Sequence, residues 1–108
     1  MDTLAWMPEP AVIALEGELD VHRAHALAPQ LSEAAGARNE DLIIDLSDVT
    51  LLDSSALGAI LQAQHDLKRQ GRTVSLVAPN GSVAAVMLDL SGQRSRFSVF
   101  ASREAVRA

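Results

Sequence analysis

The feature that most constrains the fold is a change of hydrophobic period near the middle of the chain. Residues 42–46 form an apolar run that is too short and too rich in isoleucine for a helix, which predicts a buried strand. We expect a polar turn at residues 47–48 and a second apolar patch over residues 49–52. From Ser54 onward the apolar side chains recur at helical spacing, so a helix is predicted from Ser54 to about Gln70.

Polar residues stand at the start of this helix, where Asp53 precedes Ser54 and Ser55. An Asp or Ser at such a position is the usual N-cap, because its side-chain oxygen accepts a hydrogen bond from a backbone N–H that has no partner in the helix. We therefore expect the Ser54 hydroxyl near the positive end of the helix dipole. Two serines and an aspartate are more than a cap requires, yet by themselves they do not indicate a particular chemical function.

Strands alternate with helices along the rest of the chain. The expected strands cover residues 4–7, 11–16, 73–77 and 97–100, and the expected helices cover about 20–36, 82–92 and 102–108. Such alternation implies crossover connections and a mostly parallel sheet, although the first two strands could form a hairpin and make the sheet mixed. We predict an α/β fold with a mixed sheet of four to five strands and helices mainly on one face.

The predicted helices carry two specific expectations. On the central helix, Leu57, Ile60 and Leu61 should be buried, because they share its apolar face. In the first helix, Asp20 is placed to cap the N-terminus. Pro29 would remove a hydrogen bond there at a cost of roughly 3 kcal/mol, so a kink or an irregular first turn is expected.

Composition excludes several classes of function. The chain has 108 residues, which suffices for a single domain spanning residues 1–108, and 48% of them are hydrophobic. The net charge of −5 offers no basic stripe for nucleic acid, and the absence of Cys removes disulfides and thiolate catalysis. No apolar run approaches the roughly 18 residues of a membrane span, and the N-terminus does not resemble a signal peptide. We therefore expect a cytoplasmic protein without membrane insertion.

The residues around Ser54 do not favour an enzyme. The flanking glycines of a nucleophile elbow are missing, and no motif connects a histidine to the hydroxyl. His22 and His25 share a helical face and could bind a metal, but no third ligand accompanies them. A glycine-rich phosphate loop is also absent, so we expect no catalysis, no metal and no cofactor.

Four segments, taken together and in this order, resemble the successive landmarks of the STAS domain. They are Gly17-Glu18-Leu19-Asp20, Ile43-Ile44-Asp45-Leu46-Ser47, Asp53-Ser54-Ser55-Ala56-Leu57-Gly58 and Leu88-Asp89-Leu90-Ser91-Gly92. The STAS domain occurs in bacterial anti-sigma-factor antagonists and in the cytoplasmic tails of sulfate transporters. The resemblance covers nearly the whole chain.

This resemblance implies a function and a set of site residues. In antagonists of the family, a partner anti-sigma serine kinase phosphorylates the Ser that follows the Asp at the head of the helix, which is Ser54 here. The unphosphorylated form would bind the kinase and free a sigma factor, phosphorylation would end that binding, and a PP2C-type phosphatase would reverse the modification. The implied partner-binding residues are Asp20, Asp53, Ser54, Ser55, Ala56 and Leu57.

The sequence departs from the family pattern at two positions, since Ala56 and Gln93 stand where the family commonly has Gly and Leu. The Ala56 methyl is expected close to where a partner would dock. A phosphate on Ser54 would add about two negative charges to that surface. Ser55, one residue further along, is expected nearer the core or bonded to the backbone.

One other role stays open, that of a STAS subunit in a membrane transport complex such as an ABC-type lipid or anion transporter. Nothing in the sequence separates this role from a regulatory one. A gene beside a kinase and a sigma factor would favour regulation, whereas a gene beside an ABC ATPase would favour transport.

Overall fold

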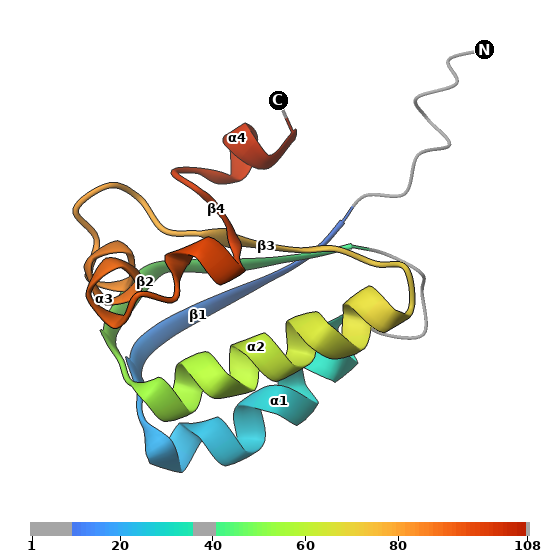
Figure 1. Ribbon diagram of the computed structural model, residues 1–108, viewed down its shortest axis with the longest axis horizontal. Coiled ribbons are helices and arrows are strands. Elements are labelled where there is room, and N and C mark those ends of the chain that lie inside the picture. The colour runs from blue at the N-terminus through green and yellow to red at the C-terminus, as the bar shows by residue number, and fades with distance from the viewer. Residues whose placement is uncertain (1–9, 36–40, 108) are drawn as a thin grey trace.

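The computed structural model describes residues 10–35 and 41–107, in which strands and helices alternate (Figure 1). The strands are β1 (Ala11–Leu19), β2 (Leu42–Leu52), β3 (Val74–Val77) and β4 (Ser98–Phe100). The helices are α1 (Val21–Ala35), α2 (Ser54–Arg69), α3 (Val83–Ser91) and α4 (Arg103–Arg107), with a 3₁₀ turn, η2, at Arg94–Arg96.

The described strands form a parallel sheet in the order β1-β2-β3-β4. Leu42 at the start of β2 lies opposite Ala11 on one side and Val74 on the other. Helices α1 and α2 lie side by side on one face, the short α4 lies on the other side, and α3 packs against β2 near the end where the strands finish (Figure 1). The predicted α/β fold with four to five strands is confirmed. The expected strand at residues 4–7, which would have made the sheet mixed, lies outside the described residues.

The central strand is longer than predicted, because its neighbour continues beside it. The turn expected at residues 47–48 is wrong, since β2 runs on to Leu52, which lies opposite Leu19 of β1. Strand β1 also continues past Gly17, where the sequence predicted its end. Gly17 has a φ of +73° beside a register shift, and glycine adopts this conformation without the strain that a side chain would bring.

Helix α1 contains Pro29 and continues through it to Ala35. The proline lies on the exposed side of the helix, whereas Leu27 and Leu31 are buried. The helix is therefore retained as predicted, and burial of its apolar side against the core offsets the cost of the missing backbone hydrogen bond.

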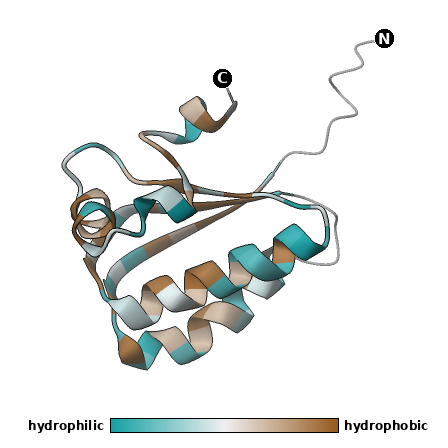
Figure 2. Cartoon of the chain, in the orientation of Figure 1, coloured by the Kyte–Doolittle hydropathy of each residue, from teal (hydrophilic) through white to brown (hydrophobic). Residues whose placement is uncertain are grey.

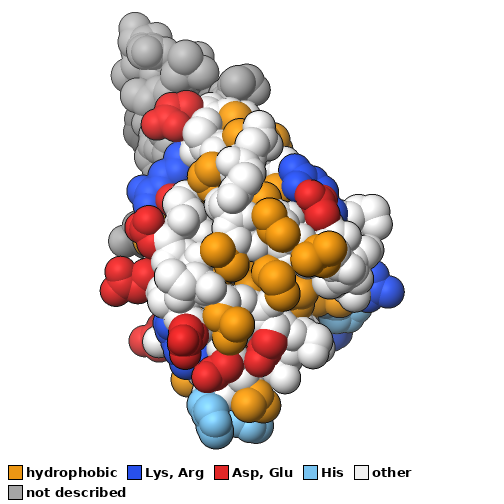
Figure 3. All heavy atoms as spheres, turned by 90° about the vertical axis from the view of Figure 1, so that its left-hand side faces the viewer, with side chains coloured by type: hydrophobic (Ala, Val, Ile, Leu, Met, Phe, Trp, Pro, Cys, Tyr) orange, Lys and Arg blue, Asp and Glu red, His pale blue; other side chains and the backbone are white. Residues whose placement is uncertain are grey.

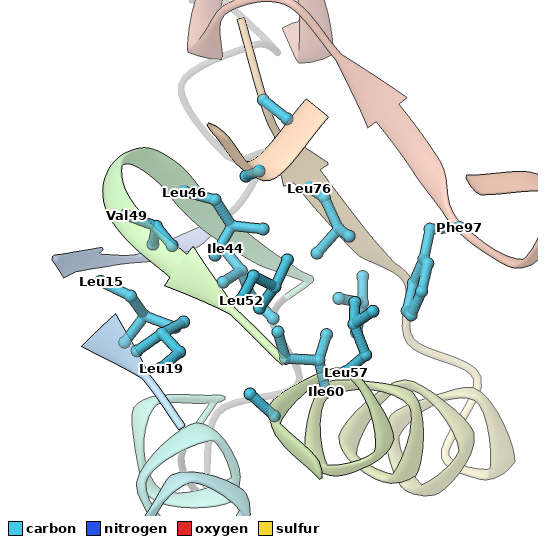
Figure 4. Packing of buried hydrophobic residues seen from close by; sticks show 14 of the residues in the cluster. Leu15, Leu19, Ile44, Leu46, Val49, Leu52, Leu57, Ile60, Leu76 and Phe97 are labelled. Carbon is cyan, nitrogen blue, oxygen red and sulfur yellow. The ribbon is translucent and has the colours of Figure 1, made fainter. Parts of the chain in front are cut away.

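The core lies between the sheet and the helices α1 and α2. Strands β2 and β3 are hydrophobic along most of their length, whereas α1 and α2 alternate between hydrophobic and hydrophilic residues (Figure 2). From Leu57 onward the buried residues of α2 recur every three or four positions. The full set is Ala56, Leu57, Ile60, Ala63 and Leu67. Figure 4 shows Leu57 and Ile60 directed from α2 toward Leu52 at the end of β2. This spacing holds α2 against the sheet along one stripe.

Leu61 is not buried as predicted, but half-buried at the edge of the core. Successive helical residues are about 100° apart around the axis, so Leu61 lies on the flank of α2 when Ile60 points at the sheet. The side chain of Leu61 lines a surface cleft instead.

Candidate functional site

The candidate site lies at the edge of the sheet where β1 and β2 end. Leu19 and Leu52 are paired neighbours in these two strands, and Asp20 and Asp53 directly follow them. The backbone N–H of Asp53 donates to the Leu19 carbonyl at 3.2 Å, which ties the two strand ends together. The structure thus brings Asp20 and Asp53, both predicted site residues, to the starts of neighbouring helices (Figure 1).

Asp20 organises the start of α1. Its Oδ1 accepts from the backbone N–H groups of His22 at 3.0 Å and Arg23 at 3.2 Å, which confirms the predicted cap. The Arg23 guanidinium reaches back and donates through Nη1 to the carbonyls of Glu16 at 2.6 Å and Glu18 at 3.2 Å. These contacts fix the end of β1 against the helix that follows it.

Asp53 is the N-cap of α2. Its backbone is extended, and its Oδ1 accepts from the Ala56 N–H at 2.9 Å. Ser54 is therefore the first residue of the helix and Ser55 the second, and neither hydroxyl serves as the cap. Because a carboxylate already occupies the capping position, the Ser54 side chain is free for other chemistry.

Both serine side chains are exposed, and neither makes a hydrogen bond within the described part of the chain. The expectation that Ser55 would lie nearer the core or bond the backbone is wrong. Ala56 and Leu57 occupy the inner arc of the first turn, which leaves Ser54 and Ser55 on its outer arc. Ala56 has no exposed surface, so its methyl group is part of the core and is not available for contact with a docked partner.

A cleft of about 230 Å³ distinguishes Ser54 from Ser55. It lies between the first turns of α2 and the end of α3, and its lining residues are Ser54, Leu57, Gly58, Leu61, Ser91, Gln93 and Arg96. Gly58 is one of these lining residues, and a Cβ added there would meet no atom within 4 Å. Gln93 was recognised from the sequence as a departure from the family pattern, whereas no motif or spacing in the sequence indicated that Arg96 would line this cleft.

The surface around this edge is apolar at its centre and acidic along one side. Figure 3 views this side of the molecule and shows hydrophobic side chains gathered in the middle, with acidic side chains below them. The exposed large hydrophobic residues near this edge are Val21 of α1, Leu51 of β2 and Val83, Val86 and Leu90 of α3. An apolar patch with a polar border is typical of a protein-binding surface.

Asp45, in the second of the four segments, has a structural role away from this edge. Its Oδ1 accepts from the Ser47 hydroxyl at 2.5 Å and the Ser47 N–H at 3.0 Å, and its Oδ2 accepts from Arg103 Nε of α4 at 2.6 Å. Burial raises the pKa of Asp45, but the hydrogen bonds from Ser47 and Arg103 outweigh burial and lower the pKa overall. The ion pair holds α4 against β2.

His22 and His25 are both exposed on α1. Over residues 10–35 and 41–107, no three His, Asp or Glu side chains are grouped so that they could hold a metal ion. Within the same ranges, no helix has the length and apolar character to cross a membrane.

Comparison with known proteins identifies the family. The family model of the STAS domain matches residues 7–106, nearly the whole chain. The chain belongs to the STAS domain family. This confirms the resemblance that the four sequence segments indicated.

Three similar proteins are each named for the same role. The anti-sigma F factor antagonist of Paenibacillus polymyxa is 32% identical over 82 residues, which cover 75% of this chain and 69% of the relative. A solved structure of the anti-sigma factor antagonist SpoIIAA in its unphosphorylated form is 28% identical, with a TM-score of 0.66, covering 88% of this chain and 83% of SpoIIAA. A Thermotoga maritima protein proposed to be an anti-sigma factor antagonist is 25% identical, with a TM-score of 0.72, covering 90% of this chain and 85% of that protein.

Proposed function

We propose that this STAS domain is an anti-sigma-factor antagonist, and that a partner anti-sigma serine kinase phosphorylates it on Ser54. The observation that carries the proposal is the Ser54 hydroxyl, which is exposed on the first residue of α2 and makes no hydrogen bond within the described residues. Since Asp53 supplies the cap, a phosphate on Ser54 leaves the helix start intact. The names of the relatives support the same role.

Phosphorylation would change the charge of the surface without unfolding the domain. A phosphoserine carries about 1.5 to 2 negative charges at pH 7, and a helix N-terminus tolerates such a group. Asp20 and Asp53 lie at the same edge of the sheet, so the added charge increases an acidic field that is already present. A partner that docks on the unmodified edge would then meet both this charge and the cost of desolvating the phosphate.

In this proposal the chain is a substrate and a binding partner, not an enzyme. The kinase supplies ATP and the catalytic groups, and a PP2C-type phosphatase removes the phosphate. The unphosphorylated form binds the kinase and thereby frees a sigma factor. This takes place in the cytoplasm, and the antagonist itself uses no cofactor and contacts no DNA.

The proposal is tested by locating the phosphate. The purified protein is incubated with ATP and each anti-sigma serine kinase of the source organism in turn, and the modified residue is mapped by mass spectrometry. We expect one phosphate, on Ser54. Ser54→Ala should abolish the modification, whereas Ser55→Ala, which alters an equally exposed hydroxyl one residue away, should retain it. Phosphate on another residue of the wild type would defeat the proposal and favour the transport-subunit role.

A further inference from the structure

Helix α3 has two apolar faces. The inward face is buried and consists of Ala84, Ala85 and Leu88. The outward face carries Val83, Val86 and Leu90, at positions i, i+3 and i+7, so the three side chains form one stripe, which we call the α3 stripe. Val83, Val86 and Leu90 are 42%, 45% and 77% exposed, respectively. These three large apolar side chains therefore face solvent, although Leu88 of the same helix is fully buried and Met87 packs partly against the core.

The α3 stripe continues into the surface around Ser54. Leu90 is followed by Ser91, which lines the same cleft as Ser54. On the other side, α3 packs against β2, and Leu51 near the end of that strand is 40% exposed. Figure 3 shows hydrophobic side chains grouped in the middle of this side of the molecule. A ligand seated over Ser54 would thus meet apolar surface on the neighbouring helix.

Charge on the border of this surface indicates which kind of partner fits it. Glu18 is paired with Leu51 across β1 and β2, and its side chain is exposed beside that leucine. Asp20 and Asp53 lie at the ends of the same two strands. The border is thus acidic along β1 and β2, whereas Arg96 lines the cleft on the other side. Such a surface is complementary to a partner that is apolar in the middle and basic at the edge that faces those two strands.

We propose that the α3 stripe is the second half of the docking site for the kinase that modifies Ser54, and that it receives an apolar, basic-rimmed surface of that kinase. This rests on the proposed function. It also explains how one phosphate ends the complex, because a doubly charged group at the edge of an apolar contact must be desolvated when the partner docks. Leu90, the most exposed residue of the α3 stripe, is the expected centre of the contact.

The test compares glutamine variants at two exposed positions. Leu90→Gln removes the apolar side chain from the α3 stripe, and Val12→Gln makes the matched change on β1, where Val12 is 42% exposed near the opposite end of the strand. Affinity for the kinase that phosphorylates Ser54 is measured by calorimetry, and circular dichroism verifies that both variants fold. We expect Leu90→Gln to weaken binding by about 10- to 100-fold and Val12→Gln by less than about 2-fold. Glu18→Gln should slow association at low salt.

The outcomes separate this inference from the proposed function. If the kinase phosphorylates Ser54 and binds Leu90→Gln as tightly as the wild type, the α3 stripe is not part of the docking site, and the proposed function stands. If no kinase binds the wild type, both the proposed function and this inference are wrong. Sedimentation of the isolated protein supplies the remaining outcome, since a dimer that Leu90→Gln dissociates would assign the α3 stripe to self-association and overturn the inference.

Discussion

The start of α2 allows the structural and functional roles of adjacent residues to be separated. Asp53 is the N-cap and Ser54 is the first helical residue, so Asp53→Ala removes an acceptor that the Ala56 N–H uses at 2.9 Å, whereas Ser54→Ala removes none. Losing such a cap costs about 1 kcal/mol, within a range of about 0.5–2 kcal/mol. For a chain of this length, about 1 kcal/mol lowers the melting temperature by about 4 °C.

Asp53→Asn provides the matched control, because asparagine keeps the side-chain acceptor and loses only the charge at the helix N-terminus, an effect of about 0.3–1 kcal/mol. Urea and thermal melts followed by circular dichroism should place Asp53→Ala lowest in stability and Asp53→Asn between it and the wild type. Ser54→Ala should lie within about 0.5 kcal/mol of the wild type, as is typical of surface substitutions. If Ser54→Ala destabilises the fold as much as Asp53→Ala does, the cap has been assigned to the wrong residue.

Three further predictions concern packing, helix propensity and pH. Ile60→Ala should cost about 2–5 kcal/mol in a urea melt because the side chain is fully buried, and Leu61→Ala should cost clearly less; equal losses would contradict the assignment of the α2 faces. Gly58→Ala should stabilise the helix by about 0.5–1 kcal/mol, since the added methyl meets no atom within 4 Å, and a loss of stability would show that the site is not open. Burial acts to raise the pKa of Asp45, but its hydrogen bonds lower that pKa overall. The ionised carboxylate therefore stabilises the fold at pH values above its ordinary pKa of 3.8, and this contribution is lost as the pH falls through the pKa of the folded state. Arg103→Gln should therefore reduce stability near pH 7 and have little effect near pH 2, and a loss that is independent of pH would count against the ion pair.

The part of the site that depends on local pattern could be read from the sequence. The change of period at Asp53 and Ser54 is visible within a few residues, so the start of α2 was predicted correctly. Asp20 was likewise predicted as the cap of α1, because a capping residue acts on the backbone immediately after it. The family resemblance rested on the same local segments and was confirmed.

Features that depend on distant parts of the chain could not be read in this way. The polar pair at residues 47–48 resembles a turn until β1 is known to run beside it, and then it is the exposed middle of a long strand. Leu61 and Ile60 are equally apolar, and only the docking of α2 on the sheet decides which one is buried. The outward direction of Leu90 is decided by the packing of α3, since the inner face of that helix is formed by Leu88 and two alanines.

The central claim is that a phosphate on Ser54 switches partner binding off. Its most direct test is the affinity of the partner kinase for the protein carrying phosphoserine at position 54, installed during translation, compared with the unmodified protein under the same conditions. A loss of about 2.7 kcal/mol corresponds to roughly 100-fold weaker binding, and we predict a change of this order. Equal affinity for the two forms would contradict the switch.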